Sequence, residues 1–112
     1  MTRSATMTRA AVGTSYYMAP EQIKNEEIDA RADIYSIGII LFEIVTGRKP
    51  FEAGSSEQII AMHLYEKPTR PSEYNEFIPP KLESLILRCL EKDRAARFAG
   101  VTELIKALRD AQ

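Results

Sequence analysis

The chain has 112 residues, which is enough for one domain with a single modest core. Its 15 basic and 16 acidic side chains nearly cancel, so no net field favours nucleic acid or an anionic membrane as a partner. One cysteine excludes an internal disulfide, and with one histidine it offers no metal-ligand spacing. The longest apolar stretch, residues 34–45, is too short to span a bilayer and no signal peptide is seen, so we expect a soluble protein of the reducing cytoplasm.

Residues 1–20 are expected to form a loop. They hold six Ser/Thr residues and two arginines but no acidic residue, and neither helical nor strand periodicity runs through them. From residue 21 onward the character changes, because apolar stripes alternate with proline- and glycine-containing turns. This pattern predicts a succession of helices.

Residues 29–46 contain the clearest helical run. Nine of the twelve residues from 34 to 45 are apolar and they surround the helical wheel, which is typical of a helix inside a core. Asp29 or Asp33 offers an N-terminal cap, and Gly47 ends the helix. The β-branched content also allows a buried strand, but the length and the caps favour a helix.

A shorter helix is predicted next, followed by a loop. Ser55 and Gln58 have capping-box spacing, and the helix that they open runs to about residue 66 with a mixed apolar face. His63 on this helix is expected to be exposed or half-buried and to have no function. Residues 67–80 hold four prolines and predict an extended surface loop.

Two amphipathic helices complete the chain. Pro80 opens the first, on which apolar residues recur at helical spacing and include Cys89 as inert core. The second repeats this pattern with Val101, Leu104, Ile105 and Leu108. The predicted fold class is therefore mainly α, a helical bundle around the helix at 29–46.

Three blocks of sequence say more than periodicity: GTSYYMAPE, DARADIYSIGIILFEIVTGRKPF and LEKDRAARF. In this order and spacing they closely resemble the C-terminal lobe of a eukaryotic-like (Hanks-type) Ser/Thr protein kinase, and the wording YYMAPEQ resembles the bacterial branch. The resemblance implies a partial activation segment and substrate loop over residues 1–20. It implies the helical C-terminal lobe of a kinase catalytic domain over residues 21–112.

The resemblance also implies roles for four positions. Thr14 matches the threonine of the loop that receives the substrate residue after the phosphoacceptor, and a plain turn threonine is the alternative. Glu21 and Arg97 match a buried structural ion pair beneath that loop. The alternative is that Glu21 is a carboxylate at the start of a helix and that Arg97 is a solvated arginine. Asp33 matches the aspartate that anchors the catalytic loop through backbone hydrogen bonds, or simply favours the positive end of its helix.

The polar tail carries two candidate modification sites. Thr8 and Thr6 precede Gly13 at distances where such kinases carry activation-loop phosphorylation sites, and Thr8 is the preferred candidate. An unmodified flexible N-terminus is the alternative.

The other kinase signatures are missing from the sequence. It has no Gly-rich loop, no strand lysine, no H-R-D loop and no D-F-G aspartate, so no catalytic residue and no site for ATP or Mg²⁺ is expected in this chain. We therefore expect a fragment that is inactive alone, with ATP and Mg²⁺ bound by the intact parent. Arg94 stands where the family usually has proline, which is expected to loosen the KDRAAR turn.

The expected function is to supply the substrate-binding platform and activation segment of a Ser/Thr protein kinase, a transferase. Expected partners are a protein substrate, the rest of the kinase domain and, through apolar surface left uncovered, a second copy of the chain. Two alternatives stay open. One is a non-catalytic kinase-like interaction module that docks partners on the helix at 54–66, and the other is an unrelated helical interaction protein, which a large distance between Arg97 and Glu21 would support.

Overall fold

The computed structural model describes residues 15–112, and in this range it contains helices and turns but no strand. The five α-helices are α2 (Pro20–Ile23), α3 (Ala30–Thr46), α4 (Ser56–Tyr65), α5 (Pro80–Cys89) and α6 (Val101–Asp110), and two short 3-10 turns are η1 (Pro71–Glu73) and η2 (Arg94–Ala96). The mainly α fold class predicted from the sequence is confirmed. The expectations for Thr6, Thr8 and Thr14 lie outside the described residues.

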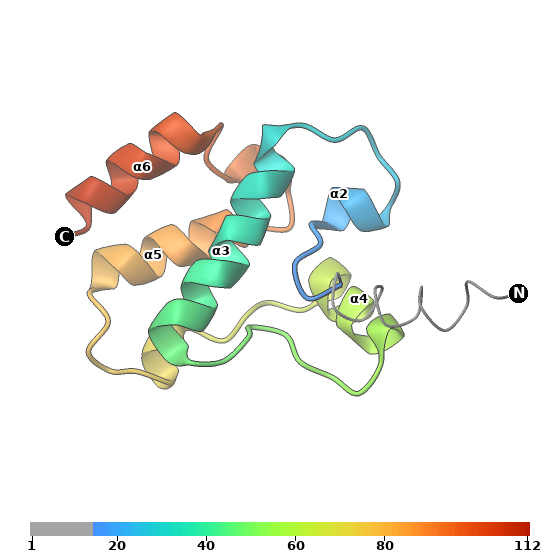
Figure 1. Ribbon diagram of the computed structural model, residues 1–112, viewed down its shortest axis with the longest axis horizontal. Helices are drawn as coiled ribbons and strands as arrows, with labels where there is room; N and C mark the ends of the chain where they lie inside the picture. Colours follow the sequence, from blue (N-terminus) through green and yellow to red (C-terminus); the bar gives the residue numbers. More distant parts are fainter. Residues whose placement is uncertain (1–14) are drawn as a thin grey trace, which may run out of the picture.

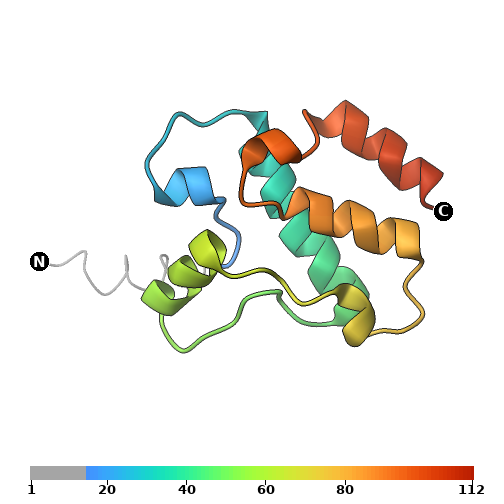
Figure 2. The same cartoon turned by 180° about the vertical axis from the view of Figure 1, so that it is seen from behind.

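Helix α3 lies at the centre of the fold, with α5 and α6 on one side of it and α2 and α4 on the other (Figures 1 and 2). The helix begins after Asp29, whose side chain accepts a hydrogen bond of 2.9 Å from the backbone N–H of Arg31. It ends at Gly47, which takes a left-handed φ of 77° that a residue with a side chain rarely adopts. Its fully buried residues are Ile34, Tyr35, Ile39 and Phe42. The predicted central helix is therefore confirmed.

The contact between α3 and α5 depends on a glycine. A Cβ atom added to Gly38 on α3 would lie 2.5 Å from Cβ of Cys89 and 3.0 Å from Cδ2 of Leu90, which is closer than two carbon atoms can pack. Cys89 is fully buried, and burial raises the pKa of its thiol to about 12. Its predicted place in an inert core is confirmed, because a thiol that keeps its proton is a poor nucleophile.

Helix α6 packs against the bundle with one narrow face. Leu104 is buried, whereas Val101 and Ile105 are exposed at 47% and 42% of their surface. The predicted apolar residues of this helix are therefore only partly buried. The reason is position: α6 lies at the periphery, where it reaches α3 and α5 from one side and is covered by no other described helix (Figure 1).

Helix α4 lies beside α2, across α3 from α6. It begins where the Ser55 hydroxyl oxygen accepts a hydrogen bond from the backbone N–H of Gln58 at 3.2 Å. Ile59 and His63 are its buried residues. The expectation that His63 is exposed or half-buried is wrong, because a spacing of four residues places it on the same inward face as Ile59, where it is 0% exposed. The predicted loop after α4 contains η1 as a single 3-10 turn.

Candidate functional site at the Glu21–Arg97 pair

Glu21 and Arg97, which the sequence assigns to one ion pair, are brought together in the structure. Arg97 donates two parallel hydrogen bonds to the carboxylate, one from Nη1 to Oε2 of Glu21 at 2.7 Å and one from Nη2 to Oε1 at 2.8 Å. The arginine side chain is 0% exposed and the glutamate side chain 3%. In this bidentate geometry each buried charge is compensated by its partner, as a salt bridge out of contact with water requires.

Arg97 also donates to three backbone carbonyls from two parts of the chain. Nε donates to the carbonyl of Glu91 at 2.8 Å, Nη1 to that of Arg31 at 2.9 Å and Nη2 to that of Lys92 at 3.2 Å. The guanidinium also lies over the ring of Tyr35, with 4.9 Å from Cζ to the ring centroid. One side chain therefore joins α2, the start of α3 and the turn after α5.

The ionised form of Glu21 is favoured by this environment. Burial raises the pKa of the carboxyl, but the hydrogen bonds from Arg97 and the backbone, together with the charge of Arg97, outweigh it and lower the pKa below its ordinary value. The pair is thus a salt bridge at neutral pH, and its contribution to stability is present above the ordinary carboxyl pKa.

The residues just before α2, here called the 15–19 segment, are bound to the central helix. Ser36 on α3 donates a hydrogen bond of 2.6 Å from its hydroxyl to the backbone carbonyl of Tyr17. The Tyr17 hydroxyl donates to Oε1 of Glu43 at 3.2 Å, and Lys49 binds the other oxygen of that carboxylate at 3.1 Å. Burial and the neighbouring Glu43 raise the pKa of Tyr17, so the tyrosine keeps its proton and acts as the donor. The segment is therefore held by α3 on one side and, through α2, by Arg97 on the other.

The turn that carries Arg97 is also fixed. Asp93 accepts a hydrogen bond of 2.9 Å from the backbone N–H of Ala95, which caps η2. Arg94 donates to the backbone carbonyl of Glu27, and its Nη1 lies 3.9 Å from Oδ2 of Asp29. The expected loosening by an arginine at this position is wrong, because the side chain links η2 to the connection between α2 and α3.

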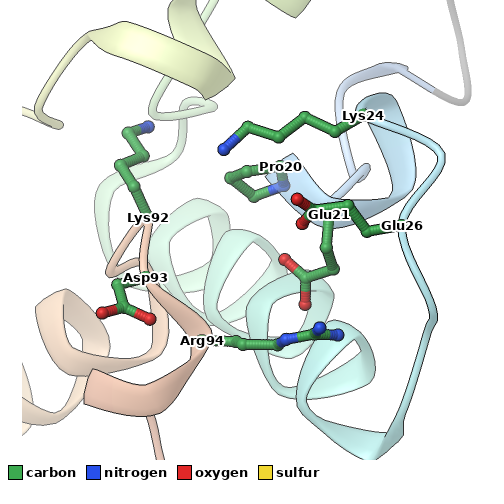
Figure 3. A pocket seen from close by; sticks show the side chains of 7 residues that line it. All are labelled: Pro20, Glu21, Lys24, Glu26, Lys92, Asp93 and Arg94. Atoms are coloured by element: carbon green, nitrogen blue, oxygen red, sulfur yellow. The ribbon is translucent and has the colours of Figure 1, made fainter.

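A pocket of about 340 Å³ opens between α2 and the turn before η2 (Figure 3). Its lining consists of Pro20 and six charged residues, namely Glu21, Lys24, Glu26, Lys92, Asp93 and Arg94. Figure 3 shows the amino groups of Lys24 and Lys92 at one end of the pocket and the Arg94 guanidinium at the other. The three cations of the lining face Glu26 and Asp93, while the third carboxylate, that of Glu21, is paired with Arg97, so the charges of the pocket nearly cancel.

The other expected site residues are placed as follows. Asp33 is exposed in the first turn of α3 and does not join the Glu21–Arg97 pair. Thr14 lies outside the described residues, directly before the 15–19 segment, and Thr8 and Thr6 also lie outside them. Within residues 15–112, no three His, Cys, Asp or Glu side chains are grouped so that they could hold a metal ion.

Two polar residues at the core were not expected from the sequence. The Nδ1 atom of His63 lies 2.6 Å from the Tyr35 hydroxyl, inside the bundle. Lys92 is half-buried, and burial lowers the pKa of its amino group to about 8. His63 could have been recognised as buried because it lies four residues after the apolar Ile59 and therefore on the same face of the helix. Nothing in the local sequence indicates that the side chain of Lys92 points into the core.

No helix in the described range is long and apolar enough to cross a membrane.

Residues 1–108 match the protein kinase domain family. Serine/threonine-protein kinase PksC of Streptomyces coelicolor is 43% identical over 103 residues, which are 92% of this chain and 18% of that protein. Serine/threonine-protein kinase PknB of Mycolicibacterium smegmatis is 38% identical over 101 residues, 90% of this chain and 16% of that protein. A probable serine/threonine-protein kinase of Clostridium acetobutylicum is 36% identical over 107 residues, 96% of this chain and 16% of that protein.

The chain thus spans less than a fifth of the length of these curated relatives. The family match covers all but the last four residues, and the similar proteins are bacterial serine/threonine protein kinases. The chain belongs to the protein kinase domain family, and within it to the bacterial Hanks-type Ser/Thr kinases.

Proposed function

We propose that this chain forms the helical C-terminal lobe of a Ser/Thr protein kinase catalytic domain and supplies its substrate-binding platform. Residues 1–20 are part of the activation segment and substrate loop, and residues 21–112 are the lobe. The observation that supports this most is the buried Glu21–Arg97 pair, because it fixes the backbone that leads out of the 15–19 segment. A segment that must present a peptide in one orientation needs such rigid support.

In this proposal Thr14 contacts the substrate residue that follows the phosphoacceptor. The residues that come after it are held at two points, by Ser36 at the carbonyl of Tyr17 and by Gln22, whose Oε1 accepts from the Ala19 backbone N–H at 2.8 Å. Holding the backbone beside Thr14 limits the positions that its hydroxyl can take. Its proposed partners in the longer enzyme are the catalytic aspartate and lysine, and the proposed acceptor is Ser or Thr of a protein.

The proposal places no site for ATP or Mg²⁺ among the described residues. No cluster of metal-ligating side chains occurs among them, and the sequence has no Gly-rich phosphate loop. We assign both to other parts of a longer kinase, where they would supply the phosphoryl group and neutralise its charge. A cytoplasmic location, where ATP is available, accompanies this activity.

The exposed side of α3 is the proposed contact with the rest of the kinase domain. Asp33, Ile37, Ile40 and Ile44 follow one another at helical spacing, and Ile40 and Ile44 are exposed at 46% and 72% of their surface. A carboxylate followed by an apolar stripe suits a covering segment that has free backbone N–H groups and apolar side chains. Where that segment is missing, a second copy of the chain is the proposed substitute.

Thr8 and Thr6 are the proposed phosphorylation sites of the activation segment. A phosphate carries about two negative charges and orders a segment when cations lie within reach. Lys49 lies over the ring of Tyr16, 4.9 Å from Nζ to the centroid, whereas Arg48 lies over the ring of Tyr74. Lys49 is already bound to Glu43, so we do not expect it to order a phosphorylated tail in this chain alone.

One observation favours a second function, that of a non-catalytic interaction module. Tyr65, at the end of α4, is exposed over 82% of its surface, which is unusual for a large aromatic residue and typical of an interface anchor. A protein that binds this chain without phosphoryl transfer would contact this end of α4.

A chimera tests the proposed kinase function. The 103 matching residues of PksC are replaced by those of this chain, and transfer of phosphate from ATP to a Ser/Thr peptide is measured. We expect the chimera to be active, this chain alone to be inactive, and Thr14→Val to lower the rate of the chimera roughly 10- to 100-fold. Thr102→Val, a change of the same chemistry at an exposed position of α6, should leave the rate unchanged. A folded chimera that binds ATP but transfers no phosphate would refute the proposal.

A further inference from the structure

His63 occupies a place where three parts of the fold meet. It comes from α4, its Nδ1 lies 2.6 Å from the hydroxyl of Tyr35 on α3, and its ring meets those of Tyr35 and Phe51 edge-on at centroid distances of 5.5 and 5.0 Å. The side chain is 0% exposed. Since Ile59 is the other buried residue of α4, the histidine is a large part of what attaches this helix to the core.

The imidazole also lies near the 15–19 segment. Helix α4 packs against α2, which directly follows this segment, and the backbone of Ser15 and that of Tyr16 lie close enough to favour a proton on the ring. The buried Nε2 atom has no hydrogen-bond partner among the described residues, so the ring meets this backbone by packing rather than by a hydrogen bond. Ser15 is itself fully buried. The imidazole therefore contacts the central helix through Nδ1, and another side of the ring faces the 15–19 segment.

Only the neutral imidazole suits these surroundings. Lys92 extends over the ring of Phe51 with 4.2 Å from Nζ to the centroid, lies 5.9 Å from that of Tyr35, and donates to the backbone carbonyl of Met62 at 3.2 Å. Arg97 covers Tyr35 and is neutralised by its own partner, Glu21. Burial and the charge of Lys92 lower the pKa of His63 to about 4, against the weaker opposite effect of the nearby backbone. A protonated ring would be a further buried cation beside Lys92.

We propose that His63 is a positioning residue for the 15–19 segment: as a neutral imidazole it joins α4, Tyr35 of α3 and the backbone of Ser15 and Tyr16, so that α4 and the segment keep one arrangement. The inference deepens the proposed function and rests on it for the role of the segment in receiving a peptide. The coupling of the two elements through His63 does not depend on catalysis. It can therefore be tested with this chain alone.

Hydrogen–deuterium exchange read by mass spectrometry tests the coupling. His63→Phe keeps a ring of similar size and removes both nitrogen atoms, and Tyr35→Phe removes the hydroxyl partner. We expect each variant to raise exchange about tenfold in residues 15–19 and in α4 together, the factor that corresponds to the loss of one buried hydrogen bond. Exchange in α5 should stay as in the unchanged protein. The matched control is Tyr65→Phe, which removes an exposed hydroxyl from the same helix and should change nothing.

A second readout separates positioning from simple packing. The chain has one histidine, so the NMR signal of its imidazole is unambiguous, and it should remain neutral until the pH falls to about 4. Exchange in α4 and in residues 15–19 should rise together as that signal titrates, and this pH dependence should vanish in His63→Phe. Faster exchange in α4 with residues 15–19 unchanged would overturn the proposal, as would an imidazole that titrates near its ordinary pKa without any effect on either element. Neither result bears on the activity of the PksC chimera, so failure here and failure of the proposed function are distinguishable.

Discussion

Glu21 and Arg97 lie 76 positions apart in the chain and meet through two hydrogen bonds of 2.7 and 2.8 Å in a site that water does not reach. The pair links the two ends of the described fold, because Glu21 is in the first described helix and Arg97 lies between η2 and the last helix. Neither residue has another charged partner that could replace the lost one at comparable distance in residues 15–112.

Loss of either member should therefore destabilise the fold strongly. We expect Glu21→Ala and Arg97→Ala each to lower the free energy of unfolding by roughly 3–5 kcal/mol, because each leaves a buried charge without its partner. The double variant should cost much less than the sum, and urea unfolding of all four proteins measures this coupling. The control is the exposed pair Arg88–Glu103, at 3.2 Å, whose coupling should stay below about 1 kcal/mol. Zero coupling between Glu21 and Arg97 would contradict the role given to the pair.

Acid should weaken the fold in a window set by His63. Its pKa is about 4 in the folded chain, against an ordinary value of 6.5, so the unfolded chain takes up a proton first as the pH falls. Stability should decrease between about pH 6.5 and pH 4, by roughly 3 kcal/mol in total. The pKa of Glu21 is lowered as well, so its contribution is lost only at lower pH, below the ordinary carboxyl value.

Urea unfolding followed by circular dichroism at several pH values measures this window. His63→Phe should remove most of the slope between pH 6.5 and pH 4. Lys92→Met should raise the pKa of His63, because the charge of Lys92 is one cause of its depression, and the NMR signal of the imidazole reports it directly. An unchanged slope in His63→Phe would assign the acid sensitivity to other groups.

Gly38→Ala should destabilise the fold although alanine is the better helix former. The preference of a helix for alanine is worth up to about 1 kcal/mol. Against this, the new Cβ would lie 2.5 Å from Cβ of Cys89, an atom that no side-chain rotation can move away, and overpacking of this kind costs about 1–3 kcal/mol. Gly54→Ala is the matched control, since the nearest atom to its added Cβ is 3.9 Å away. In thermal unfolding, the midpoint temperature of Gly38→Ala should be lower than that of the unchanged protein, and that of Gly54→Ala should be the same. Equal midpoints for the two variants would contradict the tight packing.

The central helix shows what the sequence predicts well. Its caps are local features, since Asp29 binds a backbone N–H two residues on and Gly47 needs only its own left-handed φ. The pairing of Glu21 with Arg97 is different in kind. No periodicity relates two positions so far apart, and the expectation came from the resemblance to kinases, whose motif order the residues matched.

His63 and Arg94 show where sequence reasoning failed. Both are polar: His63 was judged by its residue type, and Arg94 by the proline that the family usually has at its position. His63 is buried because it shares the inward face with Ile59. The Tyr35 hydroxyl, 28 positions away, offsets the cost of burying Nδ1, whereas Nε2 has no partner among the described residues. Arg94 binds the backbone carbonyl of Glu27, 67 positions away. Tertiary partners at such separation leave no local signal, so the effect of a polar residue on stability could not be derived from its neighbours.

The apolar stripe on α3 gives the last prediction, which concerns association. Ile40 and Ile44 lie one helical turn apart and expose 46% and 72% of their surface, so they form a patch that water solvates poorly. We expect this chain alone to self-associate at high micromolar concentration, measured by multi-angle light scattering, and the double change Ile40→Lys with Ile44→Lys to make it monomeric. Ile105→Lys on α6 is the control, because it adds the same charge at an apolar position of similar exposure to Ile40, 42%, on another face. If the unchanged chain is strictly monomeric, the stripe does not drive association; if Ile105→Lys dissociates it equally well, α6 rather than α3 forms the interface.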